Sequence, residues 1–208
     1  MRRTLIALMT GVLGCGVSGL AQAQTAPKSV PKNSAPKHVA PKAAAARPQP
    51  GPLTAAAGGA EPTLIGQFAT WGAYAATPNG KRVCFALAQP SSSKTNPPNR
   101  PRDPAYAFVS TRPAEKVVNE VSVMIGYMLK PGSESTLEVG GASFAMYTQG
   151  DGLWIKNAAE EERMVETMRR GSNFSIKGVS AKGTETTDVF SLKGLSQALD
   201  KIAQDCKR

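Results

Sequence analysis

Few residues of this 208-residue chain have the types and spacing that catalysis needs. The single histidine, His38, lies in a stretch rich in alanine, proline and lysine, so residues 61–208 hold no imidazole for a Ser-His-Asp triad, a Cys-His pair or an HExxH zinc site. The nearest approach to a GxSxG nucleophile motif, Gly178 to Gly183, has Lys182 where the second glycine belongs. Neither a Cys/His cluster nor an EF-hand loop occurs in the sequence. The sequence therefore predicts a protein that is not an enzyme and that uses no metal or cofactor.

Two pairs of serine and lysine match catalytic spacings but give little support for catalysis. Ser91 and Lys94 match the SxxK spacing, but they lie in a polar segment without SDN or KTG partners. Ser180 and Lys182 would share one face of a strand, an arrangement that is common without any catalytic role. The alternative class is an enzyme of unrecognised type, such as a hydrolase that uses carboxylates. A deep pocket holding paired carboxylates of raised pKa would favour that alternative.

The three cysteines predict one disulfide. Cys15 falls in a segment with the features of an export signal, which leaves Cys84 and Cys206 in the domain. In an oxidising compartment two remaining cysteines favour a bridge, and two buried free thiols are the alternative. Cys206 ends the apolar stripe of a helix and Cys84 lies in an alternating strand, so both side chains can face the same interior.

Binding residues are easier to find than catalytic ones. Arg100, Arg102 and Arg112 flank a proline-rich polar segment, and Tyr106 is close to them in sequence. Arginine and aromatic residues are enriched in protein interfaces, so these four residues form a candidate binding surface. The alternative is a solvated loop with scattered charge.

The N-terminal residues 1–23 have the features of a secretory signal peptide. Arg2 and Arg3 precede a short apolar run, and Ala21-Gln22-Ala23 supplies a small-x-small cleavage site. The apolar run is too short to cross a membrane as a helix. The alternative is lipidation at Cys15, which follows a sequence that loosely matches a lipobox. Both readings predict a protein that leaves the cytoplasm for the periplasm, the outer membrane or the medium.

The composition of residues 24–60 predicts a disordered tether. They are rich in alanine and proline, contain no Asp or Glu, and lack the large apolar side chains that could offset the entropy of ordering. Four lysines follow prolines and could contact an envelope polyanion: Lys28, Lys32, Lys37 and Lys42. Because the tether and the signal segment hold most of the formal net charge of +10, residues 61–208 are only mildly basic, and nucleic acid is not an expected partner.

The pattern of residues 61–208 predicts a single, mainly β domain that positions the candidate disulfide and binding residues. Eight runs have strand-like alternation or strand-like composition: 63–75, 82–88, 106–111, 120–129, 136–147, 152–155, 173–180 and 186–192. A polar loop is expected over 90–104. One helix is expected between Asn157 and Gly171, and another over 195–206. About eight strands with two helices, one of them C-terminal, predict an antiparallel β-sandwich or barrel-like fold. Trp71 and Trp154 are expected to be packing residues.

Several spaced blocks of the sequence resemble one family in their order. They are KRVCFALAQP, YAFVSTRP, NEVSVMIGYMLKPGS, GDGLWI, MRRGSNFSIKGVSAKGT and TTDVFSLKGLSQALDKIAQDC. Together they are similar to the invasion-associated locus B family of Gram-negative envelope proteins, over roughly residues 64–206. Many members have a further cysteine soon after the first tryptophan, which here would follow Trp71 and is absent. The resemblance implies an exported protein linked in some pathogens to host-cell entry, without an established biochemical activity.

Taken together, these features predict an envelope-associated protein that binds a protein or an envelope polymer. A structural spacer of the envelope is a further alternative, beside the enzyme of unrecognised type.

Overall fold

The computed structural model describes residues 51–207, which form a mainly antiparallel β domain with three α-helices. The strands are β1 (Thr63–Phe68), β2 (Trp71–Ala76), β3 (Val83–Ala88), β4 (Ser92–Asn96), β5 (Tyr106–Arg112), β6 (Val117–Met124), β7 (Glu134–Val139), β8 (Ala142–Gln149), β9 (Gly152–Ile155), β10 (Asn173–Val179) and β11 (Glu185–Ser191). The helices are α1 (Pro52–Ala56), α2 (Glu161–Arg170) and α3 (Leu195–Asp205), and short 3-10 turns span Pro78–Gly80, Pro113–Glu115 and Ala158–Glu160. The predicted fold class is confirmed, with more strands and one more helix than expected.

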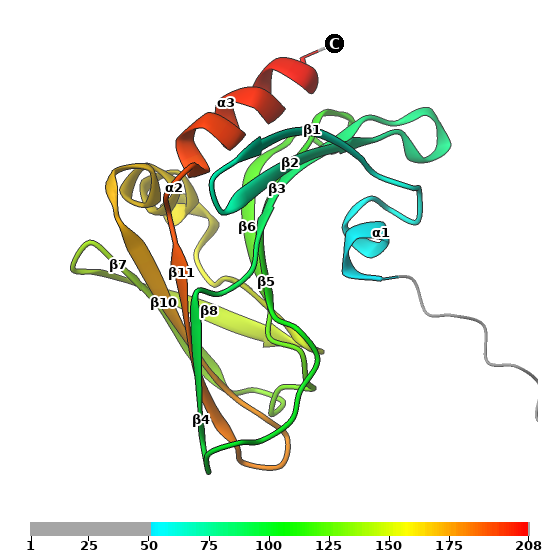
Figure 1. The fold of residues 1–208 in the computed structure, drawn as a ribbon. Helices are drawn as coiled ribbons and strands as arrows, with labels where there is room; N and C mark the ends of the chain where they lie inside the picture. Colours follow the sequence, from blue (N-terminus) through cyan, green and yellow to red (C-terminus); the bar gives the residue numbers. More distant parts are fainter. Residues whose placement is uncertain (1–50, 208) are drawn as a thin grey trace, which may run out of the picture. The chain divides into compact units, whose positions relative to one another are not determined.

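All eleven strands belong to one sheet, in the order β1-β2-β3-β5-β6-β9-β8-β7-β10-β11-β4. Only residues 89–91 separate β3 from β4, yet β4 lies at the far end of this order and pairs with β11. Such a short link requires the sheet to bend back on itself. Figure 1 shows the result, with β7, β10 and β11 lying opposite β3, β5 and β6.

The main core fills the space between the two facing parts of the sheet. Phe174 of β10 stacks on Phe190 of β11, with ring centroids 4.7 Å apart, and both side chains are fully buried. Trp71 of β2 is also fully buried, and its indole nitrogen donates a 2.9 Å hydrogen bond to the Ser191 carbonyl at the end of β11. The predicted packing role of Trp71 is therefore confirmed.

Strand β3 separates two apolar clusters, as its alternating pattern predicts. Cys84, Ala86 and Ala88 face the main core, whereas Val83 and Phe85 face a smaller cluster on the outer side of the sheet. Because successive side chains of a strand point to opposite faces, one short run of residues serves both clusters.

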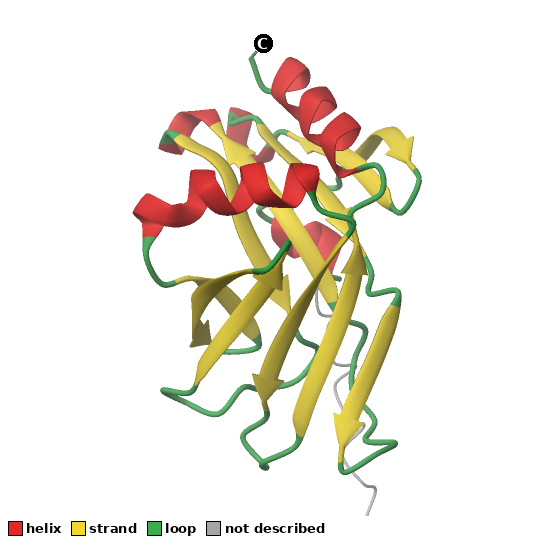
Figure 2. Ribbon diagram, turned by 90° about the vertical axis from the view of Figure 1, so that its left-hand side faces the viewer, coloured by secondary structure: helices red, strands yellow, loops and turns green. Residues whose placement is uncertain are grey.

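The helices α2 and α3 lie toward one end of the strands (Figure 2). Asn157 accepts a 3.2 Å hydrogen bond from the Ala159 amide just before α2, and Gly171 follows the last residue of that helix, as the sequence predicts. Helix α3 contacts β1, β2 and β3. Cys206, which directly follows α3, forms the predicted disulfide with Cys84, with the two Cα atoms 6.0 Å apart.

Two sequence predictions differ from the structure. The segment predicted as a polar loop contains β4, which pairs with β11 from Ser92↔Val189 to Asn96↔Glu185. Its side chains are mostly exposed, so this edge strand needs no apolar pattern and gives no strand signal.

The second difference concerns the tether predicted over residues 24–60. Within it, α1 and the turn that follows are ordered, and Ala57 has no exposure to solvent because it packs into the outer cluster with Leu53, Phe85 and Phe108 nearby. The rest of the predicted tether, its lysines and the predicted signal peptide lie outside the described residues. Within residues 51–207, no helix has the length and apolar character needed to span a membrane.

Candidate binding site

The structure divides the four residues of the predicted binding surface between two places. Arg100 and Arg102 lie on the segment between β4 and β5, beside the turn that joins β10 to β11. Tyr106 and Arg112 begin and end β5 and line a larger cavity on the outer face of the sheet. The four side chains therefore do not form one continuous surface.

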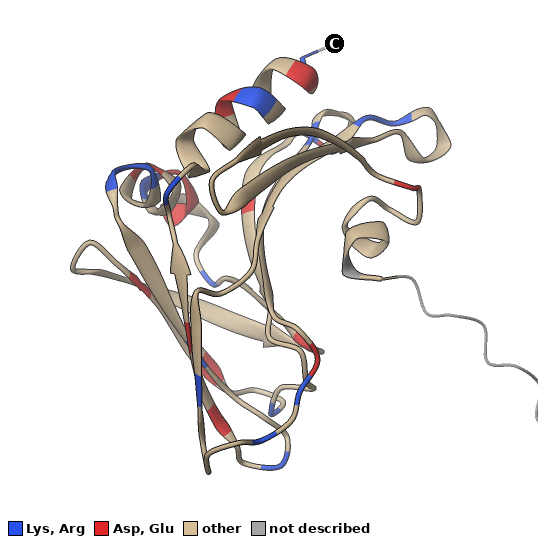
Figure 3. Cartoon of the chain, viewed as in Figure 1, with Lys and Arg blue, Asp and Glu red and all other residues tan. Residues whose placement is uncertain are grey.

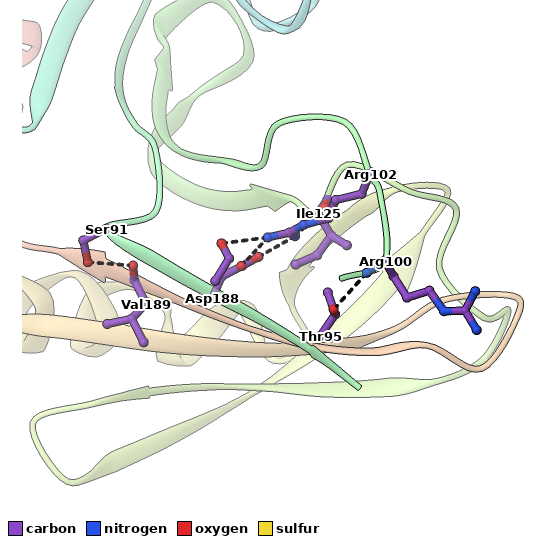
Figure 4. A network of polar contacts seen from close by, with 8 residues as sticks. Ser91, Thr95, Arg100, Arg102, Ile125, Asp188 and Val189 are labelled. Atoms are coloured by element: carbon purple, nitrogen blue, oxygen red, sulfur yellow. Dashed lines mark hydrogen bonds and ion pairs between the residues drawn. The ribbon is translucent and has the colours of Figure 1, made fainter. Parts of the chain in front are cut away.

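Arg102 is part of the internal structure of the domain (Figure 4). Its Nη1 atom donates to Asp188 Oδ2 and to the Ile125 carbonyl, both at 2.7 Å, and its Nη2 atom donates to Asp188 Oδ1 and to Ser93 Oγ. Asp188 has no exposure to solvent. These bonds connect the proline-rich segment to β11, β4 and the end of β6, so the guanidinium is engaged inside the protein. Arg100 is exposed, and its backbone amide donates to Thr95 Oγ1.

The larger cavity has a volume of about 1020 Å³, and we call it the outer groove. Its floor is a grid of alternate residues from the paired strands β5 and β6, in which Tyr106 lies opposite Met124, Phe108 opposite Ser122 and Ser110 opposite Glu120. The period of two along each strand places all six side chains on the same face. One wall comes from α1 and the residues after it, including Ala55, Ala56 and Gly58.

Serines create the hollow in this floor. Ser122 lies between Phe108 of β5 and Trp154 of β9 in one row across the sheet, and Ser110 lies between Phe85 and Glu120 in the neighbouring row. A small side chain between large ones leaves space above the strand. Ser110 and Ser122 are 6% and 7% exposed, and neither hydroxyl makes a hydrogen bond to the described part of the chain.

One end of the groove is aromatic. Trp154 of β9 stacks on its cross-strand neighbour Tyr147 of β8, with centroids 5.9 Å apart, and Tyr147 is 43% exposed. Gly152 leaves room for the Trp154 ring, because a Cβ atom at that position would come within 2.3 Å of it. Trp154 was predicted to be a packing residue. It is half-buried and also lines the groove, a role that the alternation along β9 alone does not reveal.

The other end of the groove is charged. Arg112 Nη1 donates to Glu120 Oε2 at 2.9 Å, and Arg112 Nε donates to Glu115 Oε2 at 2.7 Å. The hydrogen bond to Glu120 raises the pKa of Arg112, and although burial opposes this, Glu115 adds to the rise, so the guanidinium stays charged. Glu115 and Glu120 are thus paired with a cation and not with each other.

Carboxylates outnumber cations around the groove. Its lining includes Asp103, Glu115, Glu120 and Asp151, against Lys81 and Arg112. Elsewhere acidic and basic side chains are interspersed over the domain (Figure 3). In residues 51–207, no group of three or more Asp, Glu, His or Cys side chains is placed to hold a metal ion. The groove therefore offers aromatic side chains, free hydroxyls and one arginine paired with two glutamates, with an excess of negative charge.

The fold and the groove define a class of protein: a mainly β domain with a disulfide-fastened C-terminal helix and an open, ligand-sized hollow on the outer face of its sheet. Residues 71–203 match the family described as Invasion associated locus B (IalB) protein. That span is more than half of the chain, so the chain belongs to this family, as its sequence predicts.

The fold is similar to that of the crystal structure of invasion associated protein B from Bartonella henselae, at 18% sequence identity and a TM-score of 0.50. The match covers 70% of this chain and 98% of that chain, and at this identity it concerns the fold alone. A comparison with curated proteins gave no match.

Proposed function

We propose that this protein is an exported, envelope-associated protein that binds a partner through the outer groove and catalyses no reaction. The observation that carries the proposal is the groove floor, where the hydroxyls of Ser110 and Ser122 face a cavity of about 1020 Å³ without a hydrogen-bond partner in the described chain. A hydroxyl that has no protein partner and opens into a cavity can both donate a hydrogen bond to a ligand and accept one from it, as the few polar groups of a ligand pocket do.

Two features favour binding over catalysis. The sequence has one histidine, His38, so the groove has no imidazole to act as a general base. Of its four carboxylates, Glu115 and Glu120 are each paired with Arg112, which makes these two poor candidates for a carboxylate-based hydrolase. Membership of a family whose description is invasion-associated supports a role at the contact with a host cell.

Export is supported by the sequence of residues 1–23, and it predicts a defined N-terminus. We expect the mature protein to begin at Gln24, after the Ala21-Gln22-Ala23 site. Intact-mass spectrometry of protein taken from the envelope and from the medium measures this directly. A mass that corresponds to an acylated chain starting at Cys15 would contradict cleavage after Ala23.

The binding role is tested by filling the groove. Ser122→Leu places a larger side chain between Phe108 and Trp154, and Ser143→Leu makes the same change at an exposed position of β8 away from the groove. We expect the full-length protein and its Ser143→Leu variant to retain the same partner from envelope extracts, and Ser122→Leu to lose it while keeping a native circular dichroism spectrum. Equal retention by both variants, or no partner at all, would contradict the proposal, and the second result would favour an envelope spacer.

A further inference from the structure

We infer that the ligand of the outer groove is a neutral saccharide, an inference that rests on the binding function proposed above. Four properties of the groove lead to it: the donors and acceptors at its charged end, the free serine hydroxyls of its floor, the aromatic side chain at its other end and the sign of its charge.

The charged end offers donors and acceptors side by side. Arg112 uses one N–H of Nε and one of Nη1 for Glu115 and Glu120, which leaves three of the five guanidinium N–H groups free of described partners. The Oε1 atom of Glu120 is also free to accept a hydrogen bond from a ligand. Neighbouring hydroxyls on a sugar ring each donate and accept, so they match a fixed pair of one donor group and one acceptor group.

The floor extends this pattern. The hydroxyls of Ser110 and Ser122 can each donate and accept, and both are held on strands in the middle of the sheet. Hydroxyl groups suit a ligand whose own polar groups are hydroxyls, because each partner can donate or accept the hydrogen bond.

The aromatic end suits the apolar face of a sugar ring. Trp154 and Tyr147 stack with an angle of 25° between their planes, and Tyr147 is exposed at the surface. The face of an aromatic ring carries partial negative charge, which attracts the C–H groups on one side of a pyranose. Trp154, which lines the groove and has Tyr147 stacked beside it, can therefore contact a ligand whose hydroxyls reach the charged end.

Charge and topology argue against other ligands. The four carboxylates around the groove repel phosphate-bearing and acidic polymers, since only Lys81 and Arg112 oppose them. Strands β5 and β6 have hydrogen-bonded neighbours on both sides, so a peptide cannot add to them as a strand. A volume of about 1020 Å³ is at the upper end for small-ligand pockets, which gives room for more than one sugar ring.

The two tryptophans allow a direct test on the full-length chain. Trp71 is buried and its indole N–H bonds to Ser191, whereas Trp154 lines the groove, so two-dimensional NMR spectra contain one internal reference signal and one groove signal. The probes are chitotriose, maltotriose and cellotriose, with inorganic phosphate and a Lys-Pro repeat peptide for comparison. We expect at least one of the three saccharides to shift the Trp154 indole signal saturably while the Trp71 signal stays in place.

Variants connect the shift to the groove. We expect Ser122→Leu to abolish saccharide binding, Arg112→Gln to weaken it about tenfold through loss of charged hydrogen bonds, and Ser143→Leu to leave it unchanged. A saccharide shift that persists in Ser122→Leu would overturn the inference, as would a Trp154 shift caused by the peptide or by phosphate and by none of the saccharides.

The outcome also separates this inference from the proposed function. If no saccharide shifts Trp154 while capture of an envelope partner still depends on Ser122, the binding function stands and the saccharide is excluded. If the shift and the capture both fail, the groove is not a binding site and both proposals are wrong.

Discussion

At the scale of single residues, Asp188 is a charge with no access to solvent. Placing a carboxylate inside a protein is costly unless a cation and further hydrogen bonds compensate it. Arg102 provides both, because it is a cation and its Nη1 and Nη2 atoms each donate a hydrogen bond to one of the two Asp188 oxygens. The same two atoms also donate to the Ile125 carbonyl and to Ser93 Oγ. The pair is therefore more sensitive to the loss of one partner than to the loss of both.

We expect Arg102→Met to lower the free energy of unfolding by about 3–5 kcal/mol, because it leaves the Asp188 charge buried and unpaired. The double variant Arg102→Met with Asp188→Leu should recover most of that loss. Arg100→Met is the matched control, since Arg100 is exposed and should change stability by about 0.5 kcal/mol or less. Urea denaturation of the four proteins measures these values, and equal costs for Arg102→Met and Arg100→Met would contradict the structural role.

At the scale of elements, α2 is attached to the sheet through its first residue. Glu161 Oε1 accepts a 2.9 Å hydrogen bond from the Val121 amide of β6. Burial raises the pKa of Glu161, the bond from Val121 lowers it, and the neighbouring charge of Glu120 raises it again, for a net rise. The link between helix and sheet therefore carries an electrostatic cost when Glu161 is ionised.

This cost predicts a pH-dependent effect of Glu161→Gln. A carboxyl whose pKa is raised in the folded state stabilises the protein below its unfolded pKa and loses that contribution as pH rises through the folded pKa. The glutamine keeps an oxygen for the Val121 amide and has no charge, so we expect it to be neutral in acid and to stabilise by about 0.5 kcal/mol at pH 7. Thermal melts of both proteins between pH 3 and pH 8 check this, and a difference that does not vary with pH would contradict it.

The C-terminal helix α3 is attached to the sheet by a covalent link. The disulfide joins Cys84 of β3 to Cys206 and closes a separation of 122 residues. Bridges that close long loops restrict the unfolded chain most, although strain and residual structure reduce the gain. The bond therefore holds α3 against the first three strands in an oxidising compartment.

We expect Cys84→Ser to lower the free energy of unfolding by about 2–5 kcal/mol and to expose Cys206 as a reactive thiol. Alkylation of unreduced, denatured protein from its own compartment should label neither Cys84 nor Cys206 in the wild type. Labelling of both by mass spectrometry would refute the bridge. Reduction of the wild type should reproduce the stability loss of the variant.

At the scale of the whole molecule, the folded domain begins earlier than the sequence predicts. Ala57 is fully buried in the outer cluster, and Leu53 packs against the same cluster beside Phe85 and Phe108. The residues around α1 also form one wall of the outer groove. The last residues of the predicted tether, from α1 onward, are thus part of both the fold and the candidate site.

Two truncations test where the domain begins. We expect removal of residues 1–50 to leave the stability of the domain unchanged. Removal of residues 1–60 should lower the free energy of unfolding by about 2–3 kcal/mol, because Phe85 and Phe108 lose their apolar contacts with this segment. This value is the scale of burying one or two apolar side chains. Chemical denaturation compares the two proteins, and equal stability would show that α1 contributes nothing to the fold.

Local patterns in the sequence were enough to predict several features of the fold. Alternation along β3 divided its side chains between two faces, the helical stripe put Cys206 where it could face the same interior as Cys84, and Asn157 and Gly171 marked the segment that contains α2. These features follow from the periods of strands and helices and from capping chemistry, which involve residues close in sequence.

The way in which distant segments meet depends on contacts that local patterns do not contain. The polar strand β4 has no apolar pattern, and it is a strand because β11 pairs with it across the bend of the sheet. Arg102 is not available as a surface group, because Asp188, far away in sequence, binds its guanidinium in the interior. The outer groove exists because register places Ser122 between Phe108 and Trp154 on three different strands. Register between strands is set by the packing of whole faces, and no single stretch of sequence contains that information.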